Sequence, residues 1–452
     1  MYAVVLLLAG AVLSACDTAP VLAPTPYVMV GDAGRAEYEA IPDALRTPEI
    51  PIVYWTDRFR EPELVDDRIV YTSKRSPMSF FGTVNIAPDD PDATWDDVVE
   101  YSTIPGRHRD VRLEVTDIKQ AGNFSDVMTQ LEVRDGVLVY PDEAVGDFLH
   151  RVERFNTILQ PWLREDDDNA AVVFVHGFNN TFDGAAMRLA KTWHAIGRRG
   201  IPIVFSWPAG DDSFKPLAYN HDRESGEFAV QSLKTLLFAL AINDDIDRVH
   251  IVAHSRGTDV ASTAIREIET ELAAALGNTP FAQVARGLDD DELGERPFSV
   301  EPNEITKIET LTLVAADLDF AVFNQRFVAN RSGRAARRIL IYTSAEDRAL
   351  GISSLFSNSR KRLGRATIED FSARERELVA ALPTVEIIEC RVKTKDSHLY
   401  LFEHPATLSD MVLAIRDGRP AGAEHGRPLQ PLEPGFWVLG ETYLRPEDRE
   451  SD

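Results

Sequence analysis

The sequence predicts an α/β fold with a mostly parallel central sheet, helices on both faces and a β-rich N-terminal extension. Apolar runs of strand length alternate with helical patterns between residues 171 and 415, which is typical of a parallel sheet covered on both faces. Residues 51–140 hold short β-like segments instead. One core strand ends in a serine-containing turn that opens a helix. These three observations together indicate the fold class.

Each expected element is an apolar or periodic run bounded by turn residues. Strands are expected at 52–56, 69–72, 80–86, 111–115, 137–140, 171–175, 201–207, 249–253, 308–316, 338–343 and 385–392. Helices are expected at 144–159, 181–196, 227–241, 258–276 and 406–415. Residues 208–226 interrupt this alternation and are expected to border the functional site. Residues 277–304 also interrupt it, and they are expected to form either a cap over the site or a solvated surface loop.

The alternating segments are expected to form one domain, residues 51–416. Residues 17–50 are rich in proline and are expected to be a tether or a lightly structured lead-in. Residues 417–452 form a polar tail, apart from the apolar residues 436–439, which are expected to pack back onto the domain.

The segment Ala253-His254-Ser255-Arg256-Gly257 is the most informative in the chain. It follows an apolar run and precedes a helical pattern, which is the setting of a nucleophile elbow. The tight turn needs small residues two positions to either side of the serine, and Ala253 and Gly257 supply them. Ser255 is therefore the candidate nucleophile.

An oxyanion-binding loop is expected after the strand at 171–175, where His176-Gly177-Phe178 begins the next connection. In elbow enzymes, one backbone N–H of this loop and the N–H of the residue after the serine stabilise the tetrahedral oxyanion. By position, these donors are Phe178 and Arg256. An ordinary strand-to-helix turn is the alternative interpretation of the His-Gly pair.

A carboxylate and a histidine should follow the serine, in that order. Asp347 comes a few residues after the strand at 338–343 and is the preferred acid, with Glu346, Asp317 and Asp319 as rivals. His398 lies on the loop after the strand at 385–392 and is the preferred base. Of the other two histidines after the serine, His404 should open the last helix and His425 lies in the polar tail.

The N-terminus indicates a location in the bacterial cell envelope. Residues 1–16 form a short apolar signal segment that ends in Leu13-Ser14-Ala15-Cys16, which matches a lipobox. Cys16 is the expected lipidation site, and it would anchor the protein to a membrane with the domain facing the periplasm. A plain secretory signal or a buried N-terminal strand is the alternative. Only Cys390 then remains, so no internal disulfide is expected.

Composition and motifs exclude several function classes. The formal net charge of −25 argues against nucleic acid as a partner, because a phosphate backbone requires a basic surface. No metal-ligand spacing, phosphate-binding glycine loop or dinucleotide fingerprint occurs. Neither a metal nor an organic cofactor is therefore expected.

With these residues in place, the chain resembles a family of uncharacterised bacterial α/β-hydrolases that are esterase- or lipase-like and are often predicted lipoproteins. The resemblance covers residues 50–415 and rests on these segments: Val53-Tyr54-Trp55-Thr56-Asp57-Arg58, Phe81-Gly82-Thr83-Val84, Val175-His176-Gly177-Phe178-Asn179, Phe205-Ser206-Trp207-Pro208, Ala253-His254-Ser255-Arg256-Gly257, Asp347-Arg348-Ala349-Leu350 and Ser397-His398. It implies the α/β-hydrolase fold and places Ser255, Asp347 and His398 on the triad positions. For the Asp57-Arg58 pair, a fold-closing salt bridge and a functional contact are equal alternatives.

The leading hypothesis is a serine hydrolase that acts through an acyl-serine intermediate on carboxylic esters, lipids or acyl groups of the cell envelope. The substrate would be a small molecule or a lipid that carries an acyl group. A serine acyltransferase or a peptidase uses the same triad and is the nearest alternative. A non-catalytic envelope protein that keeps the fold as a binding module is the alternative from another class. The sequence leaves the oligomeric state and the membrane leaflet open.

Overall fold

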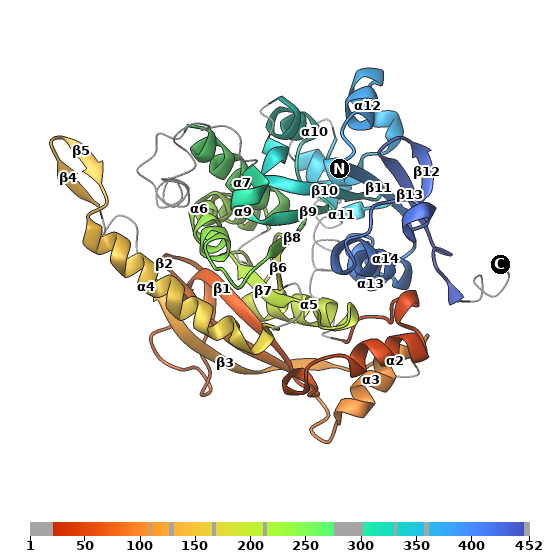
Figure 1. The fold of residues 1–452 in the computed structure, drawn as a ribbon, viewed down its shortest axis with the longest axis horizontal. Coiled ribbons are helices and arrows are strands. Elements are labelled where there is room, and N and C mark those ends of the chain that lie inside the picture. Colours follow the sequence, from red (N-terminus) through yellow and green to blue (C-terminus); the bar gives the residue numbers. More distant parts are fainter. Residues whose placement is uncertain are drawn as a thin grey trace.

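The computed structural model describes residues 21–107, 110–125, 131–164, 169–210, 215–274, 302–329, 332–356 and 361–446. Their strands form one sheet of eleven, in the order β12-β13-β11-β10-β9-β8-β6-β7-β1-β2-β3, and a separate two-stranded sheet (Figure 1). The predicted α/β architecture is confirmed.

The middle of the sheet is parallel throughout. Its strands, in spatial order, are β13 (Phe436–Gly440), β11 (Val385–Arg391), β10 (Ala336–Thr343), β9 (Ile308–Val314), β8 (Arg248–His254), β6 (Ala170–Val175), β7 (Ile201–Ser206) and β1 (Ile50–Arg60). Every residue of β7 is buried, and so is every residue of β6 after Ala170. Strands buried on both faces explain the continuous apolar runs in the sequence.

Antiparallel strands extend the sheet at both edges. β2 (Tyr71–Pro88) and β3 (Leu113–Phe124) follow β1 on one side, and β12 (Gln430–Glu433) flanks β13 on the other. The expected β-rich N-terminal part is therefore present, and it joins the core sheet through β1. The hairpin of β4 (Glu132–Arg134) and β5 (Val137–Val139) stands apart at one end of α4 (Asp142–Leu159) (Figure 1).

Helices cover both faces of the parallel strands. α6 (Lys215–Ala241), α7 (Gly257–Ala274) and α9 (Pro302–Thr306) lie on one face, and α5 (Phe182–Ala195), α13 (Tyr400–Glu403) and α14 (Pro405–Met411) lie on the other (Figure 1). The remaining helices are α2 (Asp32–Glu39), α3 (Trp95–Thr103), α10 (Phe320–Phe323), α11 (Arg348–Phe356) and α12 (Ala373–Ala380). Single turns of 3-10 or π-helix occupy Tyr27–Met29, Asp43–Leu45, Gln160–Trp162, Asn324–Ala329, Ser332–Ala335, Leu363–Arg365, Ile368–Asp370, Val412–Arg416 and Ala423–His425.

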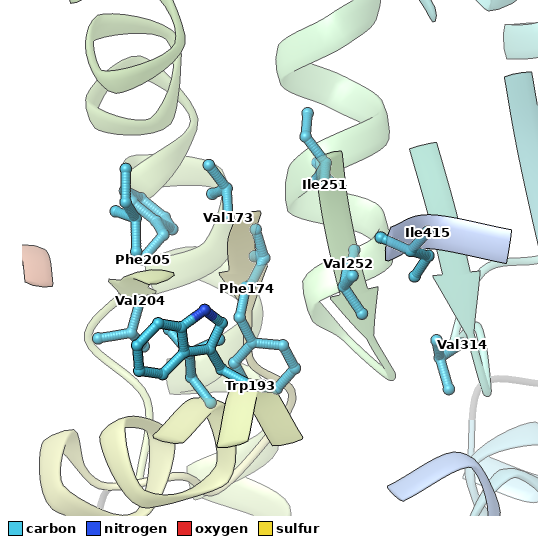
Figure 2. Packing of buried hydrophobic residues seen from close by; sticks show 14 of the residues in the cluster. Val173, Phe174, Trp193, Val204, Phe205, Ile251, Val252, Val314 and Ile415 are labelled. Atoms are coloured by element: carbon cyan, nitrogen blue, oxygen red, sulfur yellow. The ribbon is translucent and has the colours of Figure 1, made fainter. Parts of the chain in front are cut away.

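The hydrophobic core lies on both sides of the sheet. Figure 2 shows Phe174 and Val204 beside Trp193 of α5, whereas Val173 and Ile251 point to the opposite side. Successive side chains of a strand point to opposite faces, so each apolar run contributes to both layers. This two-sided packing keeps the strand ends, and the loops that leave them, in place.

The structure adds detail to three expectations about the fold. Residues 215–226, expected to interrupt the alternation of strands and helices, form the first turns of α6. The lead-in at 17–50 is not a tether where it is described: Tyr38 is fully buried and donates a hydrogen bond to the carbonyl of His194 (2.9 Å). Within the segment 417–452, residues 436–439 pack back onto the domain as expected: they belong to β13, which pairs with β11 in parallel.

Two expectations concern residues that lie outside the described ranges. These are the signal segment 1–16 with Cys16, and residues 277–301 of the possible cap. In the described part of the chain, no helix is both long enough and apolar enough to span a membrane.

The strand order creates a switch point between β6 and β8. From β6 the chain moves outward to β7 on one side, and it then returns to build β8, β9, β10 and β11 on the other. At such a point the loops after two neighbouring strands leave in opposite directions, which opens a crevice at the carboxyl ends of the strands. The loop with Gly177 and the turn with Ser255 both begin there.

Candidate active site

The turn around Ser255 has the geometry of a nucleophile elbow. Ser255 connects β8 to α7 with a φ of 53°, a left-handed conformation that costs a non-glycine residue about 1–3 kcal/mol. Its backbone N–H donates to the carbonyl of Val314 on β9 (2.9 Å). The neighbouring β9 strand thus holds the strained residue in place.

Two glycines allow the elbow to pack closely against the loop after β6. A Cβ atom on Gly257 would lie 2.5 Å from the carbonyl oxygen of Val175, and one on Gly177 would lie 2.7 Å from Cβ of Ser255. The requirement for a small residue at Gly257 was predicted. The close approach of Gly177 was not, because it depends on two segments that are distant in the sequence.

The two expected oxyanion donors are available. The backbone N–H groups of Phe178 and Arg256 donate no hydrogen bond to any residue in the described ranges. Both residues lie next to a residue of the elbow contact, Gly177 or Ser255. An unused pair of N–H groups beside a nucleophile is the arrangement that an oxyanion hole requires.

Two buried polar side chains hold the loop after β6, which is the expected oxyanion loop. The carboxylate of Asp222 on α6 accepts from the backbone N–H of Asn179 (2.9 Å), whose φ is 55°. The guanidinium of Arg58 on β1 donates to the carbonyl of Asn180 (2.7 Å). The ring of Tyr219 packs on that of Phe178, with centroids 5.7 Å apart. The expectation that residues 208–226 border the site is thereby confirmed.

Arg58 answers the open question about the Asp57-Arg58 pair. Besides Asn180, its guanidinium donates to the hydroxyl of Ser206 (2.9 Å) and the carbonyl of Ala209 (2.8 Å). Burial lowers its pKa to about 10, so it remains charged near neutrality. It is therefore a contact to the loops of the site and not a salt bridge to Asp57. The carboxylate of Asp57 has no hydrogen-bond partner among the described residues, and burial raises its pKa to about 7.

The predicted acid and base lie together. Nδ1 of His398 donates a hydrogen bond to Asp347 (2.7 Å), and both side chains are buried. The second carboxylate oxygen of Asp347 accepts from the N–H of Leu350 (3.0 Å), which orients the carboxylate. A proton on Nδ1 leaves Nε2 of His398 with a free lone pair, as a general base needs. Burial alone would lower the pKa of His398, but the charge of Asp347 and its hydrogen bond outweigh burial and raise it.

The rival acids have other roles. Glu346 is exposed. Asp319 accepts from the N–H of Ala321 and caps α10. Asp317 is buried, but it pairs with Arg362 (3.0 Å) and accepts from the hydroxyl of Ser353 (2.8 Å).

The other two histidines after Ser255 are not part of this acid–base pair. His404 caps α14 through a hydrogen bond from the N–H of Ala406 (3.2 Å), as expected. His425 is exposed beside Glu424.

The elbow and the acid–base pair meet through His254, the residue before the serine. Nε2 of His254 lies 3.1 Å from the carbonyl oxygen of His398, and the two ring centroids are 4.7 Å apart. Oγ of Ser255 is not hydrogen-bonded to the ring of His398. In free enzymes this contact is often long and tightens only when substrate binds. The pair of His398 and Asp347 thus contacts the end of β8, next to Ser255, through His254.

The structure also bears on metal binding. Among the described residues, no group of three or more His, Cys, Asp or Glu side chains is arranged to hold a metal ion.

Comparison with known proteins gives a family match. The family model for an alpha/beta hydrolase of unknown function (DUF900) matches residues 152–416. This range contains Ser255, the oxyanion loop, Asp347 and His398. No curated protein and no solved structure matches the chain.

Proposed function

Because the chain belongs to the DUF900 family of α/β hydrolases, we propose that it is a serine hydrolase that cleaves carboxylic esters through an acyl-serine intermediate on Ser255. The observation that carries this proposal is the buried hydrogen bond between His398 and Asp347, in a pair that also contacts His254, the residue before the strained Ser255. A merely structural histidine–aspartate pair has no reason to lie next to a serine with a positive φ.

The proposed reaction has two halves. Oγ of Ser255 attacks the ester carbonyl carbon while Nε2 of His398 takes the hydroxyl proton, and the new oxyanion binds the N–H groups of Phe178 and Arg256. The intermediate collapses, the alcohol leaves with the proton from His398, and an acyl-serine remains. Water then attacks the acyl carbon in the same way, which releases the acid and restores Ser255. Throughout both halves, Asp347 accepts the hydrogen bond from the Nδ1–H group of His398.

The location and the acyl donor belong to the same proposal. The lipobox at Leu13–Cys16 supports lipidation of Cys16 and anchoring in the bacterial envelope, with the domain on the periplasmic side. Such an anchor favours small-molecule or lipid acyl substrates near a membrane. Water as the acceptor makes the protein a hydrolase, whereas an alcohol or amine acceptor would make it an acyltransferase.

Labelling with a fluorophosphonate probe tests the nucleophile. The wild-type protein is expected to bind the probe covalently, and Ser255→Ala is expected to lose all labelling because the attacking oxygen is gone. Ser344→Ala is the matched control, since Ser344 is also a buried serine at the carboxyl end of a parallel strand. It should label like the wild type. A folded wild type that does not label would instead favour the non-catalytic binding protein.

The pH dependence of kcat/KM tests the base. His398 must be neutral to take a proton, so activity should fall as the pH drops through its pKa. Because the charge of Asp347 raises that pKa above the ordinary value of 6.5, half of the activity should already be lost above pH 6.5. Rates for a small p-nitrophenyl ester, measured between about pH 5 and about pH 9, locate this acidic limb. A limb near pH 4 would point to a carboxylate as the base.

A further inference from the structure

The imidazole of His254 contacts the proposed base without taking part in the proposed reaction. It is the last residue of β8, its side chain is buried, and its ring lies between the ring of His398 and that of Phe402. Its Nε2 lies 3.1 Å from the carbonyl oxygen of His398. It is therefore in contact with both the backbone and the ring of the proposed base.

The partners of His254 determine where its proton lies. A carbonyl oxygen can only accept a hydrogen bond, so Nε2 of His254 must carry the hydrogen. Nδ1 is then a bare acceptor, and this atom is buried with no hydrogen-bond partner among the described residues. An unpaired buried polar atom destabilises a fold, so packing alone does not account for a histidine here. A leucine or phenylalanine would fill the same space without that cost.

We propose that His254 is a positioning residue, whose Nε2–H holds the backbone of His398 so that its ring stays between Ser255 and Asp347. This inference rests on the function proposed above and adds a residue to it. Besides the ring bond from His398 to Asp347, mainly local contacts hold the loop of His398. Its N–H donates to Asp396 (2.9 Å) within the same loop, and Ser397 accepts from the N–H of Arg348 (3.1 Å). The bond from His254 ties this loop directly to the strand that carries the serine.

The surroundings of His254 keep it neutral. Burial lowers the pKa of His254. The charges of the groups that face it lower this pKa further: His398 on its loop, Arg188 on α5 and His176 after β6. Its neighbour His398 has a raised pKa because it faces Asp347. Of these two neighbouring histidines, His254 thus stays a neutral hydrogen-bond donor, and His398 is the base that gains the proton during attack.

Two substitutions at position 254 separate the hydrogen bond from the packing. His254→Phe keeps an aromatic ring but removes the donor, so kcat should fall about tenfold with little change in KM, because the ring of His398 is then held less firmly for proton transfer. His254→Gln places an amide N–H near the position of Nε2 and should restore most of that loss. In His254→Phe the bond from His398 to Asp347 should also loosen, which moves the acidic limb of the pH profile toward 6.5.

The matched control is His250→Phe. His250 is also buried and neutral on β8, but it lies at the amino end of the strand, where its ring bonds the hydroxyl of Thr310 (2.8 Å). This variant should lose stability and keep the wild-type acidic limb. The inference is overturned if His254→Phe keeps the wild-type kcat and limb, or if His250→Phe shifts the limb equally. Whatever the outcome at position 254, the proposed function stands if Ser255→Ala loses labelling. A folded wild type that does not label would overturn both the proposed function and this inference.

Discussion

Asp347→Asn is expected to lower kcat by about 10⁴-fold while the protein stays folded, as the equivalent change does in a Ser-His-Asp triad. An asparagine amide can donate to Nδ1 of His398, which would then hold its hydrogen on Nε2. That tautomer has no lone pair directed at Ser255, so it cannot take the hydroxyl proton. In the proposed mechanism, the reaction therefore depends on the 2.7 Å bond between these buried partners.

Single-turnover kinetics with a small activated ester measure this loss. Asp396→Asn is the matched control, because this carboxylate also contacts His398 but bonds its backbone N–H and not its ring. It should cost less than about tenfold, in line with the loss of one hydrogen bond. Asp317→Asn tests the rival acid in the same series. If Asp317→Asn abolished activity and Asp347→Asn left it intact, the assignment of the acid would be wrong.

Replacing Arg427 by Met is expected to destabilise the fold by about 3–5 kcal/mol, because it leaves the buried carboxylate of Asp410 without its cationic partner. Arg427 is fully buried and forms two hydrogen bonds to Asp410, each 2.8 Å long, and a third contact to Glu386. The hydroxyls of Tyr342 (2.7 Å) and Tyr443 (2.8 Å) also donate to Asp410. A charge of this kind, once unpaired in the interior, cannot be hydrated without unfolding the region.

Urea unfolding of Arg427→Met measures this loss. The control is Arg376→Met, since Arg376 pairs with Glu433 at the surface (3.0 Å) and should contribute less than about 1 kcal/mol. A double variant, Arg427→Met with Asp410→Leu, should recover part of the stability by removing both charges. Equal stability of the wild type and Arg427→Met would show that the buried cluster does not stabilise the fold.

This cluster also explains why the C-terminal segment is part of the domain. The hydroxyl of Tyr400 donates to the carbonyl of Tyr342 (2.7 Å) and accepts from the N–H of Ala315 (3.1 Å). Arg427 is thereby linked, through Tyr342, to the end of β9 next to the elbow. Residues after 416 are thus linked by hydrogen bonds to the strand end beside the elbow, although their composition is typical of a polar tail.

The sequence by itself determined the features that depend on neighbouring residues. Apolar runs located β6, β8, β10 and β11, because a strand buried on both faces must be apolar along its length. The elbow around Ser255 could also be predicted, since the small residues that flank the serine and the helix that follows it are neighbours in the sequence. Asp347 and His398 were predicted from their position after a strand, because polar residues at strand ends meet at one edge of a parallel sheet.

Only the tertiary structure decided which distant groups hold that edge in place. Arg58 binds a carbonyl 122 residues away, and Asp222 binds an N–H 43 residues away, and neither pairing leaves a local pattern. The sequence preferred Asp347 as the acid, but only the structure shows that Asp347 bonds His398 and that Asp317 pairs with Arg362. Buried polar groups find their partners through the packing of the whole sheet, so their roles appear only when the chain is folded.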